Sequence, residues 1–188
     1  MAVSFDRGVW LARAVKKTRG GDTTAAERYV SALETIIKWC ESRGLSVTFS
    51  KKSGGVYYTD QKEITINARA GAKQQLFLLL HECGHHLIGN AERHERYGMG
   101  YSATDVTSRR TYHHRIDILE EEFEAWHRGW KLALRLGVLS TEDKIIFDKV
   151  RIRYLRSYLL WASKAPGYEK YDEPVPENFN DEQNQAVD

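Results

Sequence analysis

This 188-residue sequence contains few cysteines, few prolines and no long apolar run. No stretch of 18 apolar residues occurs, and charged residues interrupt the apolar positions near the start. We therefore expect neither a membrane span nor a signal peptide, and we expect the protein to be cytoplasmic. The two cysteines, Cys40 and Cys83, are too few for a disulfide framework, and we expect neither to bind a metal or form a structural disulfide. All three prolines lie beyond residue 165, where we expect the folded domain to have ended.

Composition and charge divide the chain into a body and a tail. With 41% hydrophobic and 29% charged residues, the sequence is typical of a globular protein, and we expect one domain over residues 1–164. Residues 165–188 contain seven acidic residues and one lysine, which predicts a disordered acidic tail of net charge −6. The body then has 27 basic against 19 acidic side chains, net +8. Such a body can attract nucleic acid weakly, but charges spread over several helices favour scattered solubilising residues.

Periodicity predicts an α+β domain with a small antiparallel or mixed sheet. Apolar residues at spacings of three and four predict helices, and short alternating runs predict strands. The expected elements are helices over 3–18 and 24–43, a strand over 45–50, a hairpin of strands 55–59 and 63–67, a buried helix from about 76, a loop or lid over 89–115, and helices over 116–136 and 141–164, the last capped by Ser140 and Asp143. They form a helical N-terminal part (1–44), a core (45–136) and a C-terminal helix (137–164). The strand at 63–67 is a candidate for pairing with an extended peptide at a sheet edge.

The buried helix contains the motif HExxH at His81, Glu82 and His85. Residues four apart in a helix are separated by about 400°, so both imidazoles leave one face and can bind one ion. Glu82 is turned about 100° away, too far to be a natural ligand but close enough to act as general base. Five apolar residues precede the motif, and polar side chains buried with them are costly unless a cation compensates them. Zinc fits, because it suits imidazole and carboxylate ligands and a site with three protein ligands leaves one position open.

The helix over 116–136 supplies the third ligand. Its apolar stripe consists of Ile116, Leu119, Phe123, Trp126, Trp130 and Leu134. Glu121 points opposite this stripe, and Glu120 and Glu124 lie on a polar line, so we expect all three to face solvent. Glu122 flanks the stripe and shares a line with small residues, along which two helices can approach closely. These small residues are Ala125, Gly129 and Ala133. We therefore expect Glu122 to reach the ion.

Other third ligands fit less well. The metzincin pattern HExxHxxGxxH requires glycine and histidine where this chain has Ile88 and Ala91. His94, nine residues after His85, matches no known spacing and remains the outside alternative.

The order of a strand hairpin, an apolar helix with HECGH and a later helix with EFEAW resembles the gluzincins, most closely the small ImmA/IrrE-type metallopeptidases. The resemblance covers about residues 45–136. It implies a minimal zincin-like metalloprotease fold with flanking helices, in which His81, His85 and Glu122 bind zinc. Glu82 is then the catalytic base.

One position departs from the family pattern. These families usually have Asn or Asp where this chain has Trp126, so the group that orients a ligand histidine has to come from elsewhere, and Asp117 is a candidate. A lid group is also expected to steady the oxyanion that develops during hydrolysis. Tyr112, His113 and His114 are the candidates, by their proximity to Glu122 in the sequence.

The resemblance implies a zinc metalloendopeptidase that cleaves a chosen intracellular protein, such as a transcriptional repressor, in a bacterial or phage-like setting. Two alternatives remain open: a SprT-like protease acting on DNA-bound protein, and a zinc-stabilised binding domain without catalysis. SprT-like chains have a third histidine in place of Glu122, which argues against the first. An intact Glu82 argues against the second, because a purely structural site needs no base. The substrate and the oligomeric state are left open by the sequence.

Overall fold

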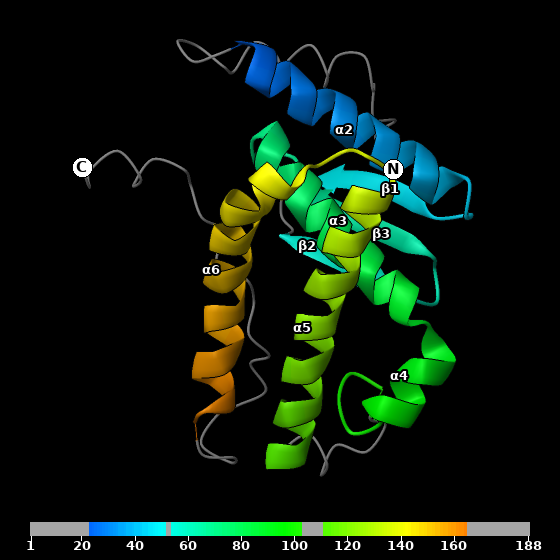
Figure 1. Ribbon diagram of the computed structural model, residues 1–188. Coiled ribbons are helices and arrows are strands. Elements are labelled where there is room, and N and C mark those ends of the chain that lie inside the picture. Colours follow the sequence, from blue (N-terminus) through cyan, green and yellow to red (C-terminus); the bar gives the residue numbers. More distant parts are fainter. Residues whose placement is uncertain (1–22, 52–53, 103–110, 165–188) are drawn as a thin grey trace, which may run out of the picture.

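The computed structural model describes residues 23–51, 54–102 and 111–164. In these residues it is an α+β structure with five α-helices and one small mixed sheet. In chain order the elements are α2 (Thr23–Glu41), β1 (Ser46–Ser50), β2 (Gly55–Tyr58), β3 (Glu63–Asn67), α3 (Ala72–Ile88), α4 (Asn90–Arg96), α5 (Tyr112–Arg135), the short 3-10 helix η2 (Thr141–Asp143) and α6 (Lys144–Ala162) (Figure 1). The predicted helix over 3–18 and the predicted tail over 165–188 lie outside the described residues.

The three strands form a sheet in the order β1-β3-β2. β2 and β3 pair antiparallel, which confirms the predicted hairpin, and β1 pairs parallel with β3. Ile64 and Ile66 of β3 are fully buried in the main core, as their alternation predicts. Because β3 is the central strand, both of its edges are occupied, and the expectation that it pairs with a peptide is wrong. The edge strands of this sheet are β1 and β2.

Helix α3 packs against α2, the sheet and α5 (Figure 1). Its apolar run from Leu76 to Leu80 is buried on every side of the helix, which is typical of a helix enclosed by the rest of a domain. The residues that follow this run, from His81 to His85, are buried as well. The HExxH motif therefore lies inside the protein, as predicted.

Helices α3 and α5 make backbone contact at two glycines. An ideal Cβ at Gly84 would lie 1.9 Å from the carbonyl oxygen of Ala125, and one at Gly129 would lie 2.3 Å from the carbonyl oxygen of Leu80. Both distances are far too short for a real Cβ, so only glycine permits this packing. The predicted line of small residues on α5 thus forms the contact with α3, and it brings Glu122 against the face of α3 that carries His81 and His85.

The segment 89–115, predicted to lack secondary structure, contains α4 and the first turn of α5, so this prediction is wrong for those residues. α5 begins at Tyr112 instead of 116 because the Thr111 side chain accepts a hydrogen bond from the His114 N–H, 3.1 Å away, and caps the helix. Residues 103–110 lie outside the described part of the chain.

The predicted apolar stripe of α5 is only half correct. Trp126 and Trp130 are buried, whereas Ile116 and Phe123 are 51% and 41% exposed. α5 contacts α3 on one side and α6 on another (Figure 1), so the helix is buried over a wider arc than one stripe. Positions that its own periodicity assigns to solvent, Glu121 among them, are consequently buried.

The two cysteines are free and fully buried, and neither belongs to a potential metal site in the described residues. Their sulfur atoms nevertheless lie only 3.4 Å apart, where Cys40 of α2 meets Cys83 of α3. Burial and the neighbouring thiol raise the pKa of Cys83 well above its ordinary value, which keeps the thiol protonated and unreactive.

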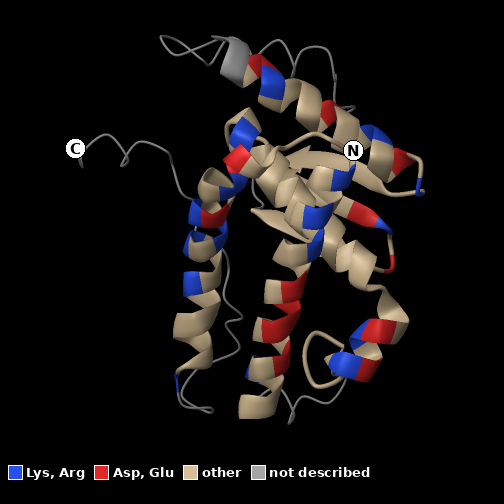
Figure 2. Ribbon diagram, in the orientation of Figure 1, with Lys and Arg blue, Asp and Glu red and all other residues tan. Residues whose placement is uncertain are grey.

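Charge is distributed over several elements. Figure 2 shows acidic residues along α5 and α4, and Lys and Arg on α2, α4 and the first half of α6. This spread agrees with the interpretation of scattered solubilising charges more than with one continuous basic face. Among the helices described, none is both long and apolar enough to cross a bilayer.

Candidate metal centre

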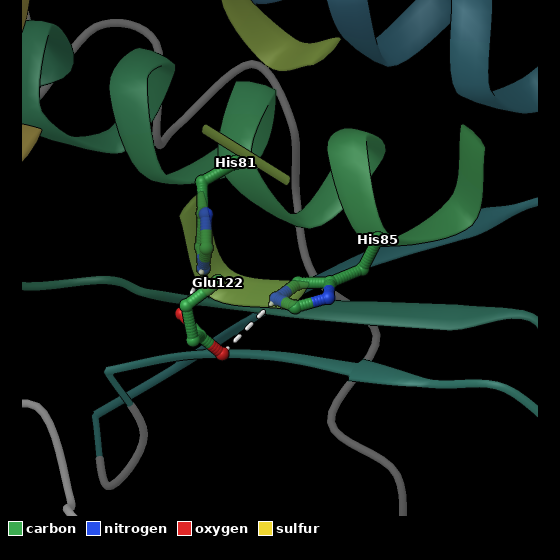
Figure 3. Close-up of side chains that lie close together, drawn as sticks. All are labelled: His81, His85 and Glu122. Atoms are coloured by element: carbon green, nitrogen blue, oxygen red, sulfur yellow. Dashed lines mark ion pairs between the residues drawn. The ribbon is translucent and has the colours of Figure 1, made fainter. Parts of the chain in front are cut away.

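His81 and His85 leave the same face of α3 and meet the side chain of Glu122 from α5 (Figure 3). His81 Nε2 lies 3.2 Å from Glu122 Oε2, and His85 Nε2 lies 3.3 Å from Glu122 Oε1. One ligand atom from each residue falls within 4.8 Å of the others, and all three side chains are buried. The structure therefore brings together the three residues selected from the sequence, and this group could hold a metal ion.

The donor set fits a cation. Glu122 Oε2 is buried and lacks a well-formed hydrogen bond, although His81 Nε2 lies 3.2 Å away. A buried carboxylate oxygen without a donor is costly, and an ion bound between the three side chains would satisfy it. Two imidazoles and one carboxylate are the ligands found in catalytic zinc sites, although they do not exclude other divalent ions.

The electrostatics of this group favour a protonated His85 beside an ionised Glu122. Burial opposes the charged form of His85, but the negative charge of Glu122 and a hydrogen bond that His85 donates to Glu121 outweigh it and raise the pKa of His85 to about 10. Burial likewise opposes ionisation of Glu122, yet the two histidines hold its pKa well below the usual range. Glu122 is therefore an anionic ligand at neutral pH, which increases the attraction for a cation.

Glu82 lies beside this group and not within it, as its position in the motif predicts. Its side chain lies against β2, where an ideal Cβ at Gly55 would lie 2.8 Å from Glu82 Oε1. The backbone of Tyr57 hydrogen-bonds the Glu82 carboxylate. Burial nevertheless raises the pKa of Glu82 above its ordinary value, with the two histidines opposing this shift. A carboxylate with a raised pKa can accept and return a proton near neutral pH.

A cavity of about 820 Å³ opens over the three potential ligands. Its walls come from β2 and the following turn, from α3, α4 and α6, and from the loop before α5. Glu82 lines the same cavity, together with five tyrosines. These are Tyr57, Tyr58, Tyr101, Tyr154 and Tyr158. The group is thus buried within the protein and still borders a cavity.

The predicted lid residues do not line this cavity. Tyr112 and His113 are exposed, and His113 Nε2 lies 3.3 Å from the Asp117 carboxylate. His114 is buried, with its Nδ1 2.6 Å from the carbonyl oxygen of Met99. None of the three predicted residues contacts Glu122, because the first turn of α5 points them away from it.

Two tyrosines occupy the place expected for the lid residues. The Tyr101 hydroxyl donates to Glu122 Oε1 at 2.8 Å and lies 3.4 Å from the hydroxyl of Tyr158, which comes from α6. Burial and the nearby Glu122 raise the pKa of Tyr101 well above its ordinary value, so the hydroxyl keeps its proton. Tyr101 lies in the segment predicted to be a loop or lid, whereas Tyr158 lies within α6 and nothing in the local sequence marks it.

Glu121 is the residue that the sequence interpretation placed wrongly. It was predicted to face solvent, yet it is fully buried, and its Oε1 lies 3.1 Å from His85 Nδ1 and 2.8 Å from Arg93 Nε. Asp117, proposed for this role, instead accepts a hydrogen bond from the Met99 N–H at 2.9 Å. The group that contacts the ligand histidine is therefore Glu121.

The two histidines are supported differently. The ring of His81 stacks on Trp126, with the centroids 4.5 Å apart, and its Nδ1 is buried without a hydrogen-bond partner. Trp126 thus replaces the missing polar group by an apolar surface. His94, the outside alternative for the third ligand, is exposed at the rim of the cavity and lies outside the potential metal group.

Comparison with known families, curated proteins and solved structures finds no match to this chain. Any functional assignment therefore depends on the geometry of the site and on the sequence motif.

Proposed function

We propose that this protein is a zinc-dependent endopeptidase of the gluzincin type with a minimal zincin-like fold. The supporting observation is the convergence of His81, His85 and Glu122 beside an open cavity that also contains Glu82. A purely structural zinc site is closed by four protein ligands, whereas three ligands beside a cavity leave a position for reactants. This difference favours catalysis over a zinc-stabilised binding domain.

His81, His85 and Glu122 would hold the ion in this proposal. Bound zinc supplies Lewis acidity and lowers the pKa of a water molecule to about 7. Glu82 takes the proton from the attacking water and passes it to the leaving amine, for which its raised pKa is suited. The Tyr101 hydroxyl donates to Glu122 and lies beside the Tyr158 hydroxyl, and we assign these two hydroxyls the role of steadying the oxyanion.

Strand β2 is the proposed guide for the substrate. It is an edge strand, it lines the cavity, and its Tyr57 backbone already reaches Glu82. An extended peptide that pairs with this edge places a peptide bond next to the general base. Gly55 permits the close approach, since a side chain there would collide with Glu82. We therefore propose β2, and not β3, as the strand that pairs with an extended peptide.

The resemblance to ImmA/IrrE-type peptidases extends this proposal to a cytoplasmic enzyme that cleaves a chosen regulator. Direct action on DNA-bound protein in the manner of SprT is less favoured, because the third group beside the two histidines is the Glu122 carboxylate and not an imidazole.

The test combines metal analysis with one substitution. Purified protein is expected to contain about one zinc ion per chain, and Glu82→Gln is expected to keep the zinc while losing cleavage. Cleavage is measured as new N-termini in a whole-proteome digest, with the Glu82→Gln protein as the matched control. If both proteins produce the same set of new N-termini, or none, the peptidase proposal is wrong.

A further inference from the structure

The carboxyl-terminal turn of α3 is held by two arginines from different helices. Arg93 of α4 donates to the carbonyl oxygen of His85 at 3.0 Å, and Arg128 of α5 donates to that of Leu87 at 2.7 Å. The last carbonyl groups of a helix have no partner within it and carry partial negative charge, so a guanidinium is favourable there. Both arginines therefore stabilise the end of the helix that carries the histidines.

Arg93 also contacts Glu121 beside the ring of His85, whereas Arg128 does not. The Nε of Arg93 donates to Glu121 Oε1 at 2.8 Å, and the same oxygen lies 3.1 Å from His85 Nδ1. Arg128 instead binds Glu92 and Glu124 at the surface of α4 and α5. One ion pair thus contacts His85 at both its backbone carbonyl and its ring.

We propose that Arg93 and Glu121 act as positioning residues, a buried brace that fixes the ring of His85 for metal binding. An acceptor at Nδ1 holds the proton on that nitrogen, which leaves Nε2 free to face the ion. The proposal rests on the same metal centre as the proposed function, but it does not require peptidase activity.

Charge explains why the brace needs both residues. Glu121 and Glu122 are consecutive, and both carboxylates are buried next to the same histidine. Two buried carboxylates side by side repel each other, which is costly unless a positive charge lies close to them. Arg93, whose Nε lies 2.8 Å from Glu121 Oε1, supplies that charge. Helix α4 therefore belongs to the metal centre, although none of its residues is a proposed ligand.

The test measures metal affinity, which needs no substrate. Zinc affinity is determined by competition with a chromophoric chelator, and the geometry is followed by the visible spectrum of the cobalt-substituted protein. Glu121→Ala is expected to weaken zinc binding by about 10- to 100-fold, with a changed cobalt spectrum. Arg93→Met is also expected to weaken zinc binding. Glu121→Gln retains an acceptor but loses the charge, so an intermediate loss is expected while the fold is preserved.

Two matched controls separate positioning from stability. Glu120→Gln changes the neighbouring exposed glutamate, and Arg128→Met removes the other arginine at the end of α3. Both are expected to retain the wild-type zinc affinity, although Arg128→Met should lower the unfolding temperature as Arg93→Met does. Wild-type affinity in Glu121→Gln and Arg93→Met, or equal losses in the two controls, would overturn the brace. Zinc binding without proteolysis leaves the brace standing and refutes only the peptidase proposal.

Discussion

Substitution of Gly84 by alanine tests whether backbone contact between α3 and α5 sets the metal centre. The new Cβ would lie 1.9 Å from the Ala125 carbonyl oxygen, and real Cβ atoms do not approach closer than 3.0 Å. The two helices must therefore separate by about 1 Å at this point, because the obstacle is backbone and has no rotamer to change. Glu122 lies one turn before Ala125 and moves with it.

The expected cost follows from two opposing effects. Overpacking of a close backbone contact costs about 3 kcal/mol, whereas alanine is favoured over glycine within a helix by about 1 kcal/mol. A net loss of about 2 kcal/mol lowers the unfolding temperature of a domain of this size by about 4–8 °C. Metal sites tolerate displacements of only about 0.2 Å in their ligand distances, so zinc affinity should fall as well.

Thermal unfolding with and without zinc measures both effects, and Gly71→Ala is the control. Gly71 precedes α3 at an ordinary φ of −70°, and a Cβ there meets no atom within 4 Å. The control is expected to unfold at the wild-type temperature and to bind zinc normally. If Gly84→Ala behaves like the control, the close contact does not determine the position of Glu122 and the reasoning is refuted.

Three further predictions follow from the site and the core. Glu122→Ala should abolish tight zinc binding while leaving the chain folded, as judged by chelator competition and circular dichroism. Tyr101→Phe should lower kcat on any cleaved substrate with little change in KM, whereas Tyr112→Phe should change neither. The Ser140 backbone and Arg28 hold the pKa of Asp143 below its ordinary value against the effect of burial. The contribution of the Asp143 carboxylate to the free energy of unfolding is therefore present at neutral pH and lost as pH falls through the lowered pKa. In denaturant unfolding, Asp143→Asn should cost about 1 kcal/mol at pH 7 and progressively less in acid.

Local sequence patterns predicted the HExxH helix well because the interactions that define it are local. The apolar run before His81 requires burial, and the spacing of four residues places both imidazoles on one face whatever lies around them. Glu122 was also predictable, because a line of small residues on one helix has few uses other than close packing. In each case the decisive property belongs to a single element.

Glu121 was predicted wrongly for the opposite reason. Its burial depends on Arg93, 28 residues earlier in the chain, and on α4, which occupies a segment predicted to be a loop. A polar residue can be buried wherever a partner from another element satisfies it, and the periodicity of its own helix contains no information about that partner. Tyr158 was missed in the same way, because only the packing of α6 against α5 brings its hydroxyl to the cavity.

The candidate site therefore has two sides. On one side, the glycine contacts between α3 and α5 and the pair of Arg93 and Glu121 hold the potential ligands. On the other side, the cavity is bounded by β2, by residues 59–61 of the following turn and by Tyr101. If the proposed peptidase function is correct, substitutions on the first side should change metal affinity. Substitutions on the second side should then change which peptides are cleaved while the metal remains bound, which would place substrate preference in β2 and the Tyr101 loop and not in the HExxH helix.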